Sequence, residues 1–180
     1  MNKSVLITGS SGFIANHLFK YLKSFNIKLV QTSRSSLDES THKLNLRDRV
    51  EIKSFTEAKA IGTILHTACN TKGLREIKQS KSIELIEEEV EQSLNLLKSL
   101  KAGSRFIYFS TADEYKESED KINEESRLQP SSVYSQAKYQ ARRALEEESK
   151  LRDIDLIVLR PFSVYGPGQP DHMFLPQLLN

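Results

Sequence analysis

The stretch Ser4-Val5-Leu6-Ile7-Thr8-Gly9-Ser10-Ser11-Gly12-Phe13-Ile14-Ala15 decides the fold of this chain. Its first five residues are mostly apolar, which is typical of a buried parallel strand, and two glycines follow at once. The apolar spacing after Gly12 predicts a helix over residues 13–25. A glycine turn between a strand and a helix directs backbone N–H groups and the positive end of the helix dipole toward one point, where they can hold a pyrophosphate.

The glycine spacing is Gly-x-x-Gly-x-x-Ala, which differs from the commoner Gly-x-Gly-x-x-Gly pattern. The strand before the turn and the helix after it provide the context that the pattern requires, and the small Ala15 lets the helix pack on the strand. We therefore predict a dinucleotide site at this turn. The alternative is a glycine-rich turn that binds no ligand.

Apolar runs of strand length alternate with helical patterns along the rest of the chain. Strands are predicted over 27–32, 43–46, 61–67, 105–110 and 154–159, and helices over 48–58, 82–101 and 131–151. This alternation predicts an α/β fold, a doubly wound parallel sheet of about six strands with helices on both faces. On the long helix, a stripe from Ile83 to Leu97 is predicted to face the core, and the acidic run 87–89 is predicted to be a solvated face.

Composition limits the classes of function. The chain has 180 residues, enough for one domain, and its net charge of +2 does not indicate a nucleic-acid partner. Cys69 is the single cysteine, so we expect no disulfide within the chain and a reducing compartment. No leader pattern and no apolar run of about 20 residues is present, so a soluble, cytoplasmic protein without membrane contact is expected. All five prolines lie at or after Pro130.

The end of the second predicted strand bears on the choice of dinucleotide. An acid near this position binds the ribose 2′-hydroxyl of NAD, whereas an arginine accommodates the 2′-phosphate of NADP. Here Ser33 and Arg34 follow the strand, and no acid appears before Asp38. The sequence therefore favours NADP and leaves NAD as the alternative. Arg34 could also be only a solvated loop residue.

A second group of polar residues indicates acid–base chemistry. Tyr134 and Lys138 are four residues apart on a predicted helix, so their side chains lie on one face, where an ammonium favours the phenolate. Alone, this pair is most often found on a surface helix. Thr111 follows the 105–110 strand, at the sheet edge where doubly wound proteins bind ligands.

These pieces, in this order, resemble the extended branch of the short-chain dehydrogenase/reductase superfamily, the nucleotide-sugar epimerases, dehydratases and reductases. The resemblance includes Leu44-Asn45-Leu46-Arg47-Asp48, which is similar to the segment bordering the adenine, and Ile64-Leu65-His66-Thr67-Ala68, which runs along the cofactor. It also includes Arg160-Pro161-Phe162-Ser163-Val164-Tyr165-Gly166-Pro167-Gly168. Ala15 replaces the usual last glycine, Asn45 an acid, and Ser163 and Glu89 the usual asparagines.

The resemblance implies roles for individual residues. Tyr134 corresponds to the general acid/base, Lys138 to its ribose-binding partner and Thr111 to the catalytic Ser/Thr. The implied cofactor-binding residues are Gly9, Ser11, Gly12, Phe13, Ile14, Ser33, Arg34, Asn45, Leu46, Thr67, Ala68, Tyr134, Lys138 and Pro161. The implied substrate-binding residues are Asp113, Ser163 and Val164, and no metal site is implied.

The implied function is an NAD(P)-dependent oxidoreductase or epimerase acting on a nucleotide sugar by hydride transfer. A 4,6-dehydratase is disfavoured because Ala112 stands where dehydratases carry the first of two acids, although Asp113 and Glu114 follow it. A dinucleotide-binding module without turnover, such as a redox sensor or structural partner, is the alternative from another class.

The resemblance also implies an organisation. Residues 1–160 are expected to form the cofactor domain with the catalytic residues, and residues 161–180 to begin a substrate-binding portion that is expected to be truncated. A homodimer through the helices 82–101 and 131–151 is also implied.

Overall fold

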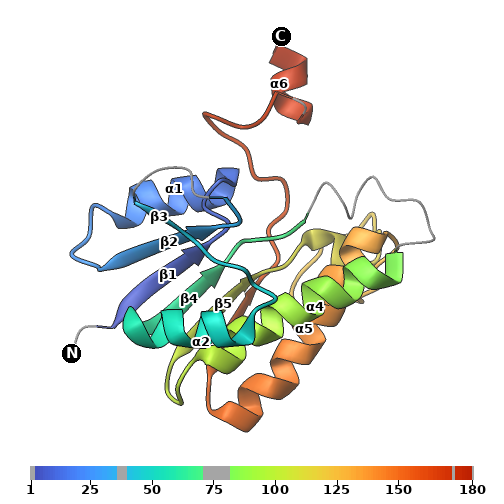
Figure 1. Cartoon of the computed structure of the whole chain (residues 1–180). Helices are drawn as coiled ribbons and strands as arrows, with labels where there is room; N and C mark the ends of the chain where they lie inside the picture. Colours follow the sequence, from blue (N-terminus) through green and yellow to red (C-terminus); the bar gives the residue numbers. More distant parts are fainter. Residues whose placement is uncertain (1–2, 36–39, 71–81, 172, 180) are drawn as a thin grey trace.

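Six parallel strands form the centre of the computed structural model, which describes residues 3–35, 40–70, 82–171 and 173–179 (Figure 1). The strands are β1 (Ser4–Thr8), β2 (Leu29–Ser33), β3 (Thr41–Lys43), β4 (Ile61–His66), β5 (Arg105–Phe109) and β6 (Asp155–Leu159). Their order is β3-β2-β1-β4-β5-β6 and every neighbouring pair is parallel. The chain proceeds outward from β1 in one direction and from β4 in the other. The doubly wound sheet expected from the sequence is therefore confirmed, with its topological switch point between β1 and β4.

Helices cover both faces of the sheet. They are α1 (Phe13–Leu22), α2 (Arg49–Ala58), α4 (Ser82–Ser99), α5 (Val133–Arg152) and α6 (Phe174–Leu179), with a 3₁₀ turn η2 (Ala112–Glu114) after β5. Figure 1 shows α2, α4 and α5 together on one face and α1 on the other, while α6 lies beyond the sheet at the end of the chain. Within the described residues, no helix is long and apolar enough to cross a membrane.

The two main parts of the core lie on opposite sides of the sheet, and a third, small cluster joins Ile86 of α4 to Ala137 of α5. The larger part joins β-strand residues to α2, α4 and α5, and includes Leu6, Ile52, Leu96, Phe106 and Leu145. The smaller part lies under α1, where Ile7, Ala15 and Leu65 pack together. Successive residues of β1, Leu6 and Ile7, thus point to opposite faces, as the two-residue repeat of a strand requires. This double burial explains why β1 is apolar nearly throughout.

The helix that carries Tyr134 and Lys138 begins at a residue fixed by local sequence. Ser132 is the N-cap of α5: its hydroxyl accepts from the Ser135 amide at 3.0 Å, and the Ser135 hydroxyl accepts from the Ser132 amide at 3.0 Å. This reciprocal capping box satisfies two amides that would otherwise lack helical partners. Helix α5 therefore starts at a defined register, which sets the direction of the side chains that follow.

Two predicted elements differ from the structure by more than two residues at one end, whereas the bounds of the others agree within two residues. The first helix ends at Leu22 rather than at residue 25, and both Tyr21 and Phe25 are exposed. The third strand covers 41–43 rather than 43–46, because pairing with β2 ends at Lys43. Leu44 and Leu46 are nevertheless buried in the core, so their alternation reflects packing of a loop rather than a strand.

Two expectations about α4 are wrong. Ile83, placed in the core-facing stripe, is 70% exposed, and Glu89, placed on the solvated face, is only 4% exposed. A helix turns by about 100° per residue, so Glu87 and Glu89 point in very different directions although they belong to one acidic run. Glu87 is exposed, whereas Glu89 points into the interior against α5.

Candidate active site

The turn after β1 touches the end of β4. Gly9 has a φ of +72°, and a Cβ on it would lie 2.8 Å from the Ala68 Cα and 2.9 Å from the Ala68 nitrogen. Both the backbone conformation and this close approach require glycine at position 9. The Gly12 amide donates to the Gly9 carbonyl at 2.8 Å, which closes the turn. The turn is therefore held against the strand on the other side of the switch point.

The N-terminus of α1 has the chemistry that a phosphate needs. Gly12 is the N-cap and makes no side-chain cap hydrogen bond, and the first turn contains no acidic residue. The first-turn amides and the positive end of the helix dipole are thus open to an anion at the carboxyl edge of the sheet. A dinucleotide pyrophosphate fits this cradle.

Two cavities open along the carboxyl ends of the strands. The first, of about 460 Å³, lies over β1, β2 and β4 and contains the glycine turn and Arg34. The second, of about 540 Å³, lies over β5 and β6 and contains Thr111, Tyr134 and Lys138. Gly12, Thr67 and Cys69 line both cavities, so the two form one continuous cleft at the switch point. Doubly wound proteins bind ligands at this position.

All the cofactor-binding, catalytic and substrate-binding residues that the resemblance implies line this cleft. The first cavity is lined by Gly9, Ser11, Gly12, Ser33, Arg34, Asn45, Leu46, Thr67 and Ala68. The second is lined by Gly12, Phe13, Ile14, Thr67, Thr111, Asp113, Tyr134, Lys138, Pro161, Ser163 and Val164. Their individual roles remain predictions. Asp38, which was weighed as the nearest acid after β2, lies outside the described residues.

The structure adds residues that sequence reasoning did not identify as site residues. Arg47 and Glu88 line the first cavity and form an ion pair at 2.5 Å, and the Gln92 amide donates to Glu88 at 2.6 Å. Cys69 is half-buried at the junction of the cavities. The Arg47–Glu88 pair joins the loop after β3 to α4. Because the two residues are far apart in the sequence, no local sequence pattern predicts their contact.

A buried carboxylate holds the loops that carry Thr111 and Pro161. Glu114 is fully buried and accepts from Arg142 Nε at 2.9 Å and from Arg160 Nε at 3.0 Å. The Ser110 hydroxyl also donates to it. Within the same loop, the Thr111 hydroxyl accepts from the Asp113 amide at 3.2 Å. These contacts tie the end of β5 to α5 and to the segment after β6, which fixes the position of Thr111 in the cleft.

Lys138 lies at the bottom of the cleft and is paired with Glu89. Its Nζ donates to Glu89 Oε1 at 2.9 Å, and the two side chains are only 2% and 4% exposed. Burial alone lowers the pKa of Lys138, but the Glu89 carboxylate opposes this and holds the pKa well above its usual value. Burial raises the pKa of Glu89, and Lys138 more than compensates, so that the pKa lies below its usual value. Both groups are therefore charged at neutral pH.

Tyr108 and Tyr134 complete the surroundings of Lys138. The Tyr108 hydroxyl donates to Glu89 Oε1 at 3.2 Å, and Lys138 Nζ lies 4.5 Å from the centre of the Tyr108 ring. Burial raises the pKa of Tyr108 well above its usual value, so Tyr108 remains a neutral donor. Tyr134 lines the same cavity as Lys138 and packs against Ile86 and Ala137. Its phenol interacts electrostatically with the Lys138 ammonium.

His66 connects β4 to both sides of the switch point. Its Nδ1 lies 2.8 Å from the Thr8 hydroxyl, and its Nε2 lies 3.2 Å from the Ser93 hydroxyl. Burial lowers the pKa of His66 to about 4, although Glu89 acts in the opposite direction. The imidazole is therefore neutral at neutral pH, and its contacts position the strand end rather than transfer protons.

This neutral histidine predicts a loss of stability in acid. The pKa of His66 in the folded state, about 4, lies below the usual 6.5. The contribution of His66 to the free energy of unfolding is therefore complete above about pH 6.5 and is lost as the pH falls toward 4. We expect the free energy of unfolding to fall by about 3 kcal/mol over this window from His66 alone. Urea unfolding measured across this range for the wild type and for His66→Gln tests the prediction. An equal pH dependence in both proteins would contradict it.

The fold and the cleft define the class of protein. A doubly wound sheet with an uncapped helix N-terminus at its switch point, and a Tyr–Lys pair in the adjoining cavity, is a dinucleotide-binding domain. Comparison with known proteins identifies the family. The model of the NAD dependent epimerase/dehydratase family matches residues 5–180, and the chain belongs to this family.

Curated relatives match almost the entire chain. A dTDP-D-glucose 4,6-dehydratase of Dictyostelium discoideum is 27% identical over 99% of this chain and 48% of its own length. An uncharacterized UDP-glucose epimerase of Bacillus subtilis is 26% identical over 94% of this chain and 60% of its own length. The chain thus spans about half to three fifths of the length of these two relatives.

Solved structures show the same fold. The protein MoeE5 in complex with UDP-glucose and NAD superposes with a TM-score of 0.82 and 25% identity, covering 98% of this chain and 60% of MoeE5. A UDP-glucose 4-epimerase of Thermotoga maritima superposes with a TM-score of 0.78 and 22% identity, covering 94% of this chain and 59% of that protein. The second likeness concerns the fold alone.

Proposed function

We propose that this chain forms the NAD(P)-binding and catalytic part of an oxidoreductase or epimerase that acts on a nucleotide-activated sugar. The observation that carries the proposal is the continuous cleft, in which the uncapped N-terminus of α1 and the group of Thr111, Tyr134 and Lys138 lie next to each other. Similarity to a dehydratase and an epimerase of sugar nucleotides supports the substrate class.

The residues of the second cavity have complementary roles in the proposed reaction. Tyr134 takes a proton from a sugar hydroxyl or returns one to a carbonyl, and the nearby Lys138 ammonium stabilises the phenolate form. Thr111 holds the reacting oxygen by a hydrogen bond. A nicotinamide bound in the cleft would supply the hydride acceptor or donor. The protein thus supplies placement and proton transfer.

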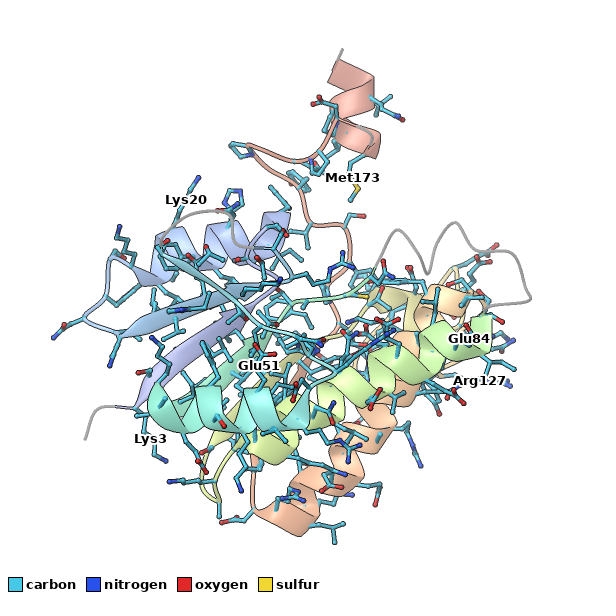
Figure 2. The ribbon with its side chains drawn as sticks, in the orientation of Figure 1. Lys3, Lys20, Glu51, Glu84, Arg127 and Met173 are labelled. Atoms are coloured by element: carbon cyan, nitrogen blue, oxygen red, sulfur yellow. The ribbon has the colours of Figure 1, made fainter. Side chains whose placement is uncertain are left out.

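Residues 161–180 are proposed to begin the substrate-binding portion, next to a cofactor domain formed by residues 1–160. Pro161, Ser163, Val164 and Met173 line the second cavity, so this segment borders the place where a sugar would lie. Figure 2 shows Met173 beside α6, on the segment that extends beyond the sheet. The segment is also tied to α1, because His17 Nε2 lies 2.9 Å from the Pro167 carbonyl oxygen.

A single-step reduction of a keto-sugar nucleotide agrees better with this cavity than a 4,6-dehydration. Thr111 is followed by Ala112 rather than by an acid, although Asp113 lines the cavity one residue later. The runner-up from another class is a dinucleotide-binding module without turnover. Incubation with oxidised or reduced cofactor and a panel of nucleotide sugars, followed by nicotinamide absorbance, separates these functions. Cofactor binding without any turnover would favour the module.

NADP is the proposed cofactor, with NAD as the alternative. Arg34 is exposed at the rim of the first cavity, next to Ser33, where a guanidinium can pair with a 2′-phosphate. Arg47 lines the same cavity but is already paired with Glu88. Arg34 is therefore the better candidate to bind the 2′-phosphate of NADP.

We expect NADPH to bind more tightly than NADH, and Arg34→Ala to weaken NADPH binding about tenfold while leaving NADH binding unchanged. Fluorescence titration with each dinucleotide measures both affinities. Arg105→Ala is the matched control, because Arg105 is an exposed arginine at the opposite end of the strands. Equal affinity for the two dinucleotides in the wild type would contradict the role of Arg34 and favour NAD.

A homodimer through α4 and α5 is also proposed, on the basis of the resemblance. These two helices pack side by side on one face of the sheet, so they present one joint surface (Figure 1). Light scattering on the purified chain tests this proposal, and a monomeric mass at working concentration would contradict it.

A further inference from the structure

A glutamate occupies the interior beneath the proposed catalytic pair. Glu89 projects from α4 between α5 and β5, where Lys138 and Tyr108 both donate to its Oε1 at 2.9 and 3.2 Å. The Cys69 thiol also forms a hydrogen bond with this carboxylate. Lys138 and Glu89 are 49 residues apart in the sequence, and each is almost completely buried. A carboxylate in this position adds a negative charge directly beside the machinery assigned to proton transfer.

We propose that Glu89 is a positioning residue that fixes the Lys138 ammonium beneath the cleft and keeps the Tyr134–Lys138 pair fully protonated at neutral pH. The inference rests on the proposed function, because it concerns the proton that Tyr134 would transfer. It assigns Tyr134 the role of proton donor at the start of the reaction, which is the role that reduction of a sugar carbonyl requires.

Glu89 holds the Lys138 ammonium in one place. A lysine Nζ has three hydrogens and a long, flexible stem, and in a dry interior it needs an acceptor to hold it in one place. Glu89 provides that acceptor, and Tyr108 holds Glu89 in turn while its ring lies against the ammonium. Lys138 is thereby held at the cavity that contains Tyr134 and Thr111.

The negative charge of Glu89 acts on Tyr134 and Lys138 as a coupled pair. Among the described residues, the titratable groups that act on Lys138 are Glu89 from α4, Tyr108 from β5, Tyr134 from α5 and Cys69 after β4, and His66 of β4 interacts with Lys138 as well. Asp113 and Tyr165 line the same cavity. His66 and Tyr108 are neutral at neutral pH. The Glu89 anion disfavours deprotonation of either partner, so it moves the first proton loss of the coupled pair to higher pH.

Replacement of the carboxylate by an amide tests the proposal. Tyrosine Cζ and lysine Cε shifts, followed by NMR as the pH is raised, report which protons leave Tyr134 and Lys138; this titration needs neither cofactor nor turnover. In Glu89→Gln we expect the first deprotonation of the pair at a pH lower by about one unit or more. Glu87→Gln, the same change at an exposed position of α4, is expected to leave the titration unchanged, and Glu89→Asp is expected to retain most of the wild-type behaviour.

An unchanged titration in a folded Glu89→Gln protein would overturn the proposal. If this variant does not fold, the double variant Glu89→Gln/Lys138→Met buries no unpaired charge and gives an independent answer. Because the two opposite charges are removed together, the Tyr134 titration is expected to stay close to that of the wild type. If the pH at which Tyr134 loses its proton rises by about one unit in the double variant, Lys138 acts on Tyr134 without an opposing effect of Glu89. This result would also overturn the proposal. Failure of the proposed function would appear instead as absent cofactor binding or absent turnover.

Discussion

Turnover in a Tyr134→Phe variant is expected to fall by about 10²–10⁴-fold, while cofactor affinity stays close to that of the wild type. The change removes only the phenolic oxygen, which is the group proposed to transfer the proton in the second cavity. The ring still packs against Ile86 and Ala137, so the fold and the cofactor cleft are expected to persist. Nicotinamide absorbance during incubation with nucleotide sugars measures the turnover, and dinucleotide titration measures the affinity.

Tyr139→Phe provides the matched control, because Tyr139 lies on the same helix but is not among the residues lining the second cavity, and its ring contacts Arg142. This variant is expected to turn over at the wild-type rate. Unchanged turnover in Tyr134→Phe would contradict the assignment of Tyr134 as general acid/base. In that case, none of the residues assigned from the sequence would serve as the proton-transfer group of the cleft.

Lys138→Met is expected to destabilise the folded chain by about 3–5 kcal/mol, because it leaves the Glu89 carboxylate buried without its cationic partner. Methionine fills most of the space of the lysine stem, so the loss reflects the uncompensated charge more than a cavity. Urea or guanidinium unfolding of the wild type and the variant measures the difference in free energy of unfolding.

The double variant Lys138→Met/Glu89→Gln isolates the charge effect. With both charges absent, we expect most of the lost stability to return, since a buried ion pair replaced as a unit often has little net cost. A double variant as unstable as Lys138→Met would show that packing, and not the unpaired carboxylate, causes the loss. Exposed pairs such as Arg105–Asp155 are expected to matter far less when either partner is replaced.

The fold was predictable because its signals are local. The strand, glycine turn and helix at residues 4–22 follow each other directly, and helices with apolar spacing precede β4, β5 and β6. The position of β3 was predicted incorrectly because Leu44 and Leu46 are buried from a loop, and burial alone does not reveal backbone pairing.

The lining of the cleft was largely predictable, whereas its electrostatics was not. Turns at the carboxyl ends of parallel strands meet at one edge, so Gly9, Thr67 and Thr111 could be assigned to one site from their places in the pattern. The sequence alone places Glu89 in a solvated acidic run, because nothing within α4 reveals that Lys138 approaches from another helix. The resemblance offered one signal, since an acid stands there in place of the family's asparagine.

Because Cys69 lies at the junction of the two cavities, a spectroscopic label can be attached there. As the single cysteine, it offers one attachment point for a small thiol-directed fluorophore or a nitroxide, without any engineered substitution. A label there would border both cavities, so one signal could report ligand binding in either of them.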